Sequence, residues 1–157
     1  MGSMAERDRD DAGRPRNTRP RDALGRPLPH GSEGVERIPD DLDLPPAETL
    51  AYAQKLLDDG MAFHAHEVLE AAWKNGPDAE RTFWQSLAQL AVGITHIQRG
   101  NTQGALAVLD RARARLADAS VAHDVDVPGL VVYAESLIED LEAGAAIDPQ
   151  RLRPRLR

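Results

Sequence analysis

The sequence predicts an all-α protein: a single-domain bundle of about five helices with antiparallel neighbours, preceded by an irregular N-terminal segment. Apolar residues recur at helical spacing in several segments between residues 46 and 141. Glycine and proline residues separate these segments by short connections, which favour antiparallel packing of neighbours. No segment shows the pattern of a strand. A chain of 157 residues is long enough for one domain with a single core.

The predicted helices begin and end at residues typical of helix termini. Pro46 suits the first turn of the first helix. The pair Asn75-Gly76 predicts a left-handed end to the second helix, and Asp78 predicts the cap of the third. Asn101 or Thr102 is expected to cap the fourth. The expected helices cover approximately residues 46–59, 61–74, 80–99, 103–118 and 128–141.

Regions outside the helices have a different composition. Residues 1–39 are rich in Arg, Asp, Pro and Gly, and we expect them to be mostly disordered or draped over the surface. Within them, residues 1–3 resemble an expression scar. Residues 40–148 form the predicted helical domain, and residues 149–157 form a basic C-terminal tail. Four apolar side chains are expected to anchor the N-terminal segment: Leu24, Leu28, Val35 and Ile38.

Charge and composition exclude several classes of function. Residues 40–148 hold 19 acidic and 7 basic side chains, so the domain would repel a phosphate backbone and no nucleic-acid partner is expected. The four arginines of the C-terminal tail are expected to be solvated. The chain has no cysteine, and its longest uncharged run, residues 82–98, is too short and too polar to span a bilayer. We therefore expect a cytoplasmic protein with no membrane partner.

The third predicted helix is the best candidate for a buried central helix. Its interior carries no charge in a chain that is 29% charged. On a helical wheel Gln85, Gln89 and His96 form a narrow polar line, and Gly93 leaves room beside it. Buried amides and imidazoles need hydrogen-bond partners, which the second helix could supply.

Two adjacent aromatic residues near the start of this helix lead to a separate expectation. Phe83 and Trp84 are expected to face opposite sides of the helix. One of them would then be exposed and could belong to a surface for a partner.

The second predicted helix carries the residues most suggestive of a site. His66 and Glu70 lie one turn apart, beside an apolar stripe, and Trp73 and Phe63 border them. Burial of a histidine and a glutamate is costly unless each has a partner. We therefore expect a polar site between the second and third helices.

These residues form a pattern that resembles the bacterial domain-of-unknown-function family 309. The pattern consists of Phe63-x-x-His66-Glu67-x-Leu69-Glu70-x-x-Trp73, then Gln85, Gln89 and His96, then Arg99-Gly100-Asn101 with Gly104-Ala105. The resemblance covers approximately residues 46–118. It implies a small all-α domain with the His-Glu motif on an inner helix, and no established activity. Ser86 departs from the pattern, because a glycine would be expected after Gln85.

Two functional interpretations follow from this constellation. In the first, His66, Glu70 and His96 bind a divalent metal with water as a further ligand, in a hydrolase-like enzyme. Glu67 would then act as a base or as a partner of a ligand residue. In the second, the same polar groups form a pocket for a small ligand or a proton shuttle. In both, Gln85 and Gln89 would contact the ligand, with Trp73 and Phe63 as its apolar border.

A structural interpretation carries the greatest weight. In it, His66 pairs with Gln89, Glu70 accepts a hydrogen bond from His96, and the network fixes the register of two helices. Phe63 and Trp73 would then be core residues. A further interpretation is a homo- or hetero-oligomeric scaffold that uses leftover apolar surface. The sequence names neither a reaction nor a substrate.

Overall fold

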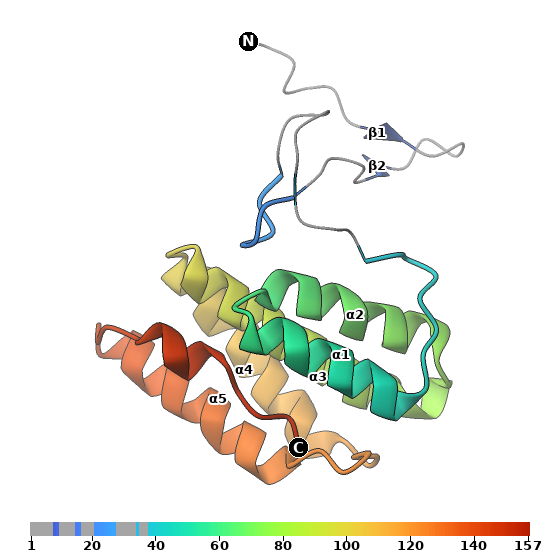
Figure 1. Cartoon of the computed structure of the whole chain (residues 1–157). Helices are drawn as coiled ribbons and strands as arrows, with labels where there is room; N and C mark the ends of the chain where they lie inside the picture. Colours follow the sequence, from blue (N-terminus) through green and yellow to red (C-terminus); the bar gives the residue numbers. More distant parts are fainter. Residues whose placement is uncertain (1–7, 10–14, 17–20, 28–33, 35–37) are drawn as a thin grey trace.

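The computed structural model describes residues 8–9, 15–16, 21–27, 34 and 38–157. Within these described residues the chain forms five α-helices, which confirms the all-α prediction (Figure 1). The helices are α1 (Pro46–Asp58), α2 (Ala62–Asn75), α3 (Arg81–Gln98), α4 (Thr102–Asp118) and α5 (Val127–Glu142).

Four shorter elements accompany the helices. Two 3-10 turns, η2 (Asp78–Glu80) and η3 (Pro149–Leu152), precede α3 and follow α5. The sequence analysis expected no strand, whereas two dipeptide strands, β1 (Asp8–Arg9) and β2 (Pro15–Arg16), pair antiparallel near the N-terminus. They lie outside the bundle, so the fold class is unaffected (Figure 1).

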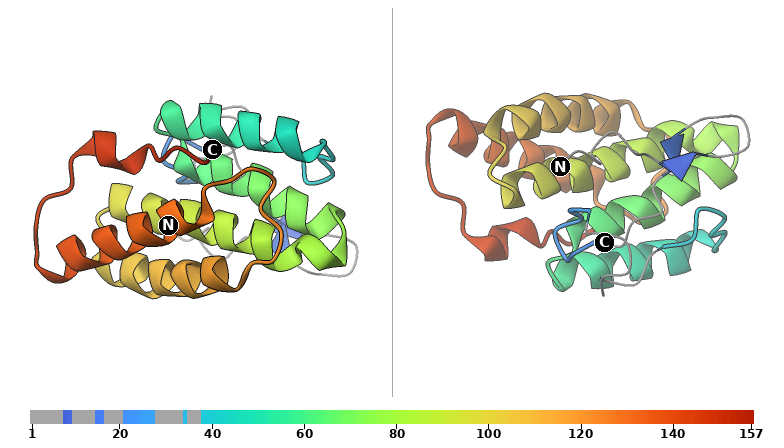
Figure 2. Two further views of the ribbon diagram at one scale, coloured as in Figure 1. Left: turned by 90° about the horizontal axis from the view of Figure 1, so that it is seen from below. Right: turned by 90° about the horizontal axis from the view of Figure 1, so that it is seen from above.

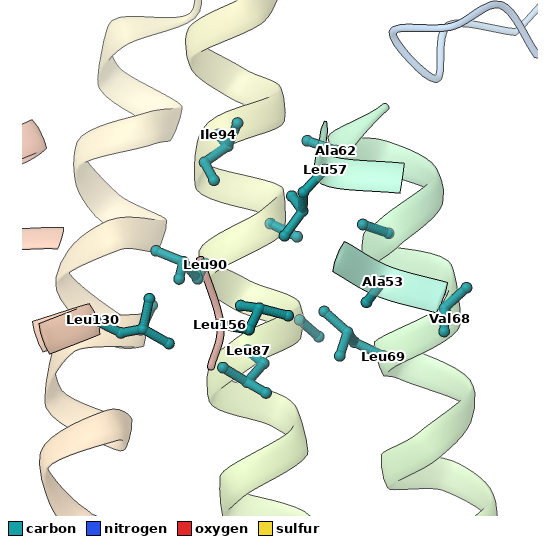
Figure 3. Close-up of a cluster of buried hydrophobic side chains, with 14 of the residues drawn as sticks. Ala53, Leu57, Ala62, Val68, Leu69, Leu87, Leu90, Ile94, Leu130 and Leu156 are labelled. Atoms are coloured by element: carbon teal, nitrogen blue, oxygen red, sulfur yellow. The ribbon is translucent and has the colours of Figure 1, made fainter. Parts of the chain in front are cut away.

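The bundle is organised around α3. This helix packs against both α2 and α4, while α1 covers α2 and α5 covers α4 (Figures 1 and 2). Its side chains Leu87, Leu90 and Ile94 are at most 2% exposed and point into the apolar core (Figure 3). The prediction of a buried central helix is therefore confirmed, and its lack of charge follows from its enclosure on several sides.

The prediction that Phe83 or Trp84 is exposed is wrong. Phe83 is 1% and Trp84 2% exposed. The helical wheel placed them on different sides of α3, but the loop between α4 and α5 covers the second side through His123, whose ring stacks on the Trp84 indole. No partner surface is left at these two aromatic residues.

The predicted helix ends are only partly correct. Asn101 caps α4 by accepting a hydrogen bond from Gly104 N at 3.0 Å. Gly76 follows α2 but has φ −95°, so it is extended rather than left-handed. Asp78 does not cap α3, because the chain first forms η2 and α3 begins at Arg81.

Both chain ends contribute to the core. Ile38 is 5% exposed and belongs to the hydrophobic cluster, and Leu24 is half-buried. Leu28 and Val35 lie outside the described residues. The C-terminal tail differs from the solvated tail expected from its charge, because Leu152 and Leu156 are buried within the bundle. Alternation of leucine and arginine lets one side of the tail pack while the other remains in water.

Replacing Gly93 with valine should lower the free energy of unfolding by about 2 kcal/mol, a usual cost of overpacking a core. A Cβ atom here would lie 2.5 Å from Cδ2 of the buried Leu109 side chain, so this side chain, or the two helices that hold it, would have to shift. Urea denaturation measures the change. Ala114→Val, on the exposed side of α4, is the control and should have a much smaller effect. Equal losses in the two variants would contradict a requirement for close helix approach.

Candidate functional site

His66 and Glu70 form a hydrogen-bonded pair on α2. His66 Nε2 lies 3.0 Å from Glu70 Oε2, and His66 Nδ1 lies 3.3 Å from the Phe63 carbonyl oxygen. Both ring nitrogens thus lie within hydrogen-bond distance of an oxygen atom. Lys74 Nζ donates to Glu70 Oε1 at 2.8 Å. Three side chains spaced by one helical turn, His66, Glu70 and Lys74, are therefore joined by hydrogen bonds along α2.

The partners of Glu70 determine its protonation state. The hydrogen bond from His66, followed by the interaction with Lys74, lowers the pKa of Glu70 from 4.5 to about 2, although burial opposes this shift. Its side chain is 37% exposed and that of His66 is 17% exposed. Glu70 is thus a firmly ionised carboxylate at the edge of the bundle and a poor general acid.

His96 has a different partner from the one expected. Its Nδ1 lies 3.2 Å from Asn101 Nδ2, at the junction between α3 and α4. Burial, and then the charge of Arg99, lowers the pKa of His96. Among the described residues, no three His, Cys, Asp or Glu side chains are grouped so that they could hold a metal ion. The geometry gives no support to the three-ligand centre of His66, Glu70 and His96.

The two glutamines of α3 do not share a hydrogen-bond partner. Gln85 Oε1 accepts a hydrogen bond from Arg115 Nη1 of α4 at 2.5 Å. Gln89 Oε1 is buried and has no hydrogen-bond partner among the described residues. The structure therefore shows neither the expected His66–Gln89 pair nor a common network of these amides with Glu70. Ser86, the departure from the family pattern, is fully buried and donates to the Phe83 carbonyl oxygen at 2.6 Å.

The two aromatic residues of the motif lie beneath cationic side chains. The guanidinium carbons of Arg21 and Arg99 lie 4.7 and 5.4 Å from the centre of the Phe63 ring. Such distances favour cation–π attraction. Gly25 also packs against this ring, since a Cβ atom there would lie 2.1 Å from Phe63 Cγ. The Phe63 ring is thus covered by Arg21, Gly25 and Arg99, so it is not an open surface for a ligand.

Trp73 and Glu67 lie farther along α2. Trp73 is half-buried against the core, with Arg81 and Lys74 at 5.6 and 5.8 Å from its ring. Glu67 and Glu70 line a recess of about 40 Å³ that residues 38–40 help to close. This recess is too small for an organic ligand. Of the motif residues, Phe63 contacts Arg21 and Gly25, and Glu67 and Glu70 lie beside residues 38–40.

His64 is a buried polar residue to which the sequence analysis gave no role. It is 1% exposed, and its Nδ1 has no hydrogen-bond partner among the described residues. Burial, and then the charge of Arg21, lowers the pKa of His64. Its spacing to Val68 and Ala71, which are also buried, is a helical stripe that could have revealed its burial.

A second polar cluster, also missed, joins α3 to the loop before α5. Glu80 Oε1 accepts hydrogen bonds from Trp84 Nε1 at 3.1 Å and from His123 Nε2 at 2.8 Å. These contacts, above all that with His123, lower the pKa of Glu80. His123 and Asp124 have φ values of 43° and 65°. No local sequence signal indicates this turn, because non-glycine residues rarely adopt it.

Glu80 and Trp84 also line a cavity beside α2. The cavity has a volume of about 470 Å³ and lies between the start of α1, the end of α2 and the start of α3. Its lining is largely apolar, and its charged members are Asp43 and Glu80. The lining comprises Leu42, Asp43, Leu44, Pro45, Pro46, Thr49, Val68, Ala72, Asn75, Gly76, Pro77, Glu80 and Trp84.

The fold and these sites define a small all-α domain with a His-Glu pair on α2 and an acidic cavity at one end. Residues 50–108 match the family described as Domain of unknown function (DUF309). The match confirms the resemblance seen in the His66–Trp73 motif. No helix of the described residues combines the length and apolar character needed to cross a membrane.

A curated bacterial relative is similar to part of the chain. It is the Uncharacterized protein YpuF of Bacillus subtilis (strain 168), which is 46% identical over 44 residues. The alignment covers 27% of this chain and 25% of the relative, so the chain matches about a quarter of that protein's length. No solved structure matches the chain.

Replacing Glu70 with glutamine should reduce stability at neutral pH by about 1 kcal/mol, because solvent screens an ion pair that is partly exposed. The folded-state pKa is lowered, so the contribution is complete above pH 4.5 and is lost as the pH falls toward 2. Urea unfolding at several pH values measures the difference. Glu139→Gln, on an exposed side of α5, is the control. A difference that persists undiminished in acid would contradict this role.

Stability should also fall between pH 7 and pH 5 because of His64. Its folded-state pKa lies below the ordinary 6.5, so the unfolded chain binds the proton more readily as the pH falls. His64→Leu should therefore be less sensitive to pH in this range than the parent protein. Parallel urea titrations at the two pH values test this. An unchanged pH dependence in the variant would show that His64 does not resist protonation.

Proposed function

We propose that this protein is a non-catalytic helical domain that binds a small organic cation in the cavity beside Glu80. One observation carries the proposal: an apolar cavity of about 470 Å³ has a fixed carboxylate in its wall. Small-ligand sites are typically apolar cavities of this size with a few placed polar groups.

The orientation of Glu80 supports this assignment. Both of its hydrogen bonds end on Oε1, and they hold the carboxylate against the Trp84 indole. The lowered pKa keeps Glu80 ionised at neutral pH. The carboxylate is therefore preorganised, so that a ligand would not have to order it on binding.

Charge supports a cation in preference to an anion. The described residues that line the cavity include Asp43 and Glu80 but no Lys, Arg or His. The helical domain as a whole also has an excess of acidic side chains. Both features favour a positively charged ligand, and the apolar walls favour one with a hydrocarbon body.

We assign the His66–Glu70 pair a structural role in this proposal. His66 and Glu70 bond to each other. His66 also contacts the Phe63 carbonyl oxygen and Glu70 accepts from Lys74, so all of these partners lie within α2. Such a pair stiffens the surface of the helix that receives the N-terminal residues. We do not propose a metal-dependent reaction, because the described residues contain no suitable group of three ligands.

Benzylamine, a small aromatic cation, should bind in this cavity more tightly than benzyl alcohol, its neutral counterpart. Glu80→Gln should weaken benzylamine binding about tenfold, since an ionic hydrogen bond contributes more than a neutral one. The Trp84 Nε1–H resonance in nitrogen-resolved NMR spectra reports occupancy, because this group contacts Glu80.

Glu139→Gln serves as the control for a lost negative charge far from the cavity. It should leave benzylamine binding unchanged. Equal affinity for the amine and the alcohol would refute selection of a cation. No shift of the Trp84 resonance with either compound would refute a ligand site at Glu80.

A further inference from the structure

The C-terminal segment, residues 149–157, runs between α1 and α5 (Figure 2). The surface of α1, of α5 and of the loop before α5 that contacts this segment is called the groove below. The apolar side chains of the segment alternate with arginines. Leu152, Pro154 and Leu156 are buried, and Leu156 reaches the core beside α3 (Figure 3). The segment therefore behaves as an extended peptide ligand that happens to be covalently attached.

The groove binds the backbone of this segment as well as its side chains. Gln54 of α1 donates from Nε2 to the Pro154 carbonyl oxygen and accepts from Leu156 N, both at 2.8 Å. Asp126 N donates to the Leu156 carbonyl oxygen at 3.0 Å. A side-chain amide that bonds both backbone groups acts as a neighbouring strand would, so it selects an extended chain.

Charge complementarity adds to these contacts. Arg155 Nη1 lies 3.5 Å from Asp58 Oδ2 of α1. Arg151 pairs with Asp140 of α5 and also donates to Ser136 Oγ at 3.0 Å. The groove thus matches a segment in which arginines alternate with apolar residues. The same sequence supplies both the acidic groove and the basic segment.

The connection between α5 and the segment is exposed. Residues 142–146 and 148 lie on the surface, and Gly144 has φ +71° where the chain turns away from α5. These residues add little burial, so the segment is held mainly by its own contacts in the groove. An exposed connection of this kind lets a bound element move to an identical site on another molecule without repacking the helices.

We propose that the groove between α1 and α5 also accepts the C-terminal segment of a second copy of this chain, giving a reciprocally exchanged dimer. Every contact described above is conserved in the exchange, because each groove again receives residues 149–157. The attached segment has the advantage of high effective concentration, so the dimer becomes populated as the protein concentration rises. This inference does not rest on the proposed ligand site beside Glu80.

Charge reversal provides a test with full-length chains. A groove-reversed variant carries Asp58→Arg and Asp140→Arg, and a segment-reversed variant carries Arg151→Asp and Arg155→Asp. In either variant alone, like charges oppose the chain's own segment. In an exchanged heterodimer of the two variants, every one of these pairs is again of opposite charge. Light scattering coupled to size exclusion measures the dimer fraction after equilibration at high concentration.

The equimolar mixture should contain a severalfold larger dimer fraction than either variant alone. Circular dichroism first establishes that each variant keeps its helices; if the double variants lose them, the single variants Asp58→Arg and Arg155→Asp replace them. A mixture of the groove-reversed variant with the unmodified protein is the control, since only one of its two exchanged grooves is matched. A mixture of the reversed variants that is as monomeric as this control would overturn the proposal.

Discussion

Enclosure of α3 is the constraint on which the rest of the structure depends. A stretch of 17 uncharged residues cannot remain stable in water, so it must be covered along most of its circumference. Helices α2 and α4 cover two sides, each backed by an outer helix. Leu156 of the C-terminal segment belongs to the same buried cluster as Leu87 and Leu90 of α3 (Figure 3). Two leucines of an otherwise basic segment are thereby buried in the apolar core.

The helices could be predicted because their signals are local. Each has an apolar stripe at regular spacing, and Asn101 had the side chain that its cap position requires. The His66–Glu70 contact follows from the same spacing. Gly76 illustrates the limit of such signals: its type suits a left-handed residue, but the chain continues extended into η2. The residue type at Gly76 indicates that α2 ends there, but not the direction in which the backbone continues.

The site could be predicted only in part. A helical wheel shows which way a side chain points from its own helix, but not which residues of other elements lie next to it. His96 lies near the end of α3, where the Asn101 side chain is within reach, and the wheel contains no information on this. Glu80 and His123 meet across 43 positions of sequence through a turn with two left-handed residues. Their contact depends on tertiary packing, so no periodicity in either segment could indicate it. The buried imidazole of His64, by contrast, was detectable from its stripe.

The loop before α5 connects the two regions that carry the proposals. Its His123 ring holds Glu80, its His123 carbonyl oxygen accepts from Arg157, and Asp126 N donates to Leu156. If withdrawal of the C-terminal segment displaced this loop, it would also weaken the hydrogen bond between His123 and Glu80. Thermodynamic reciprocity then requires the converse: a cation seated beside Glu80 would tighten the hold on the segment by the same factor. Two sites on opposite sides of one short loop would in this way share a single coupling free energy.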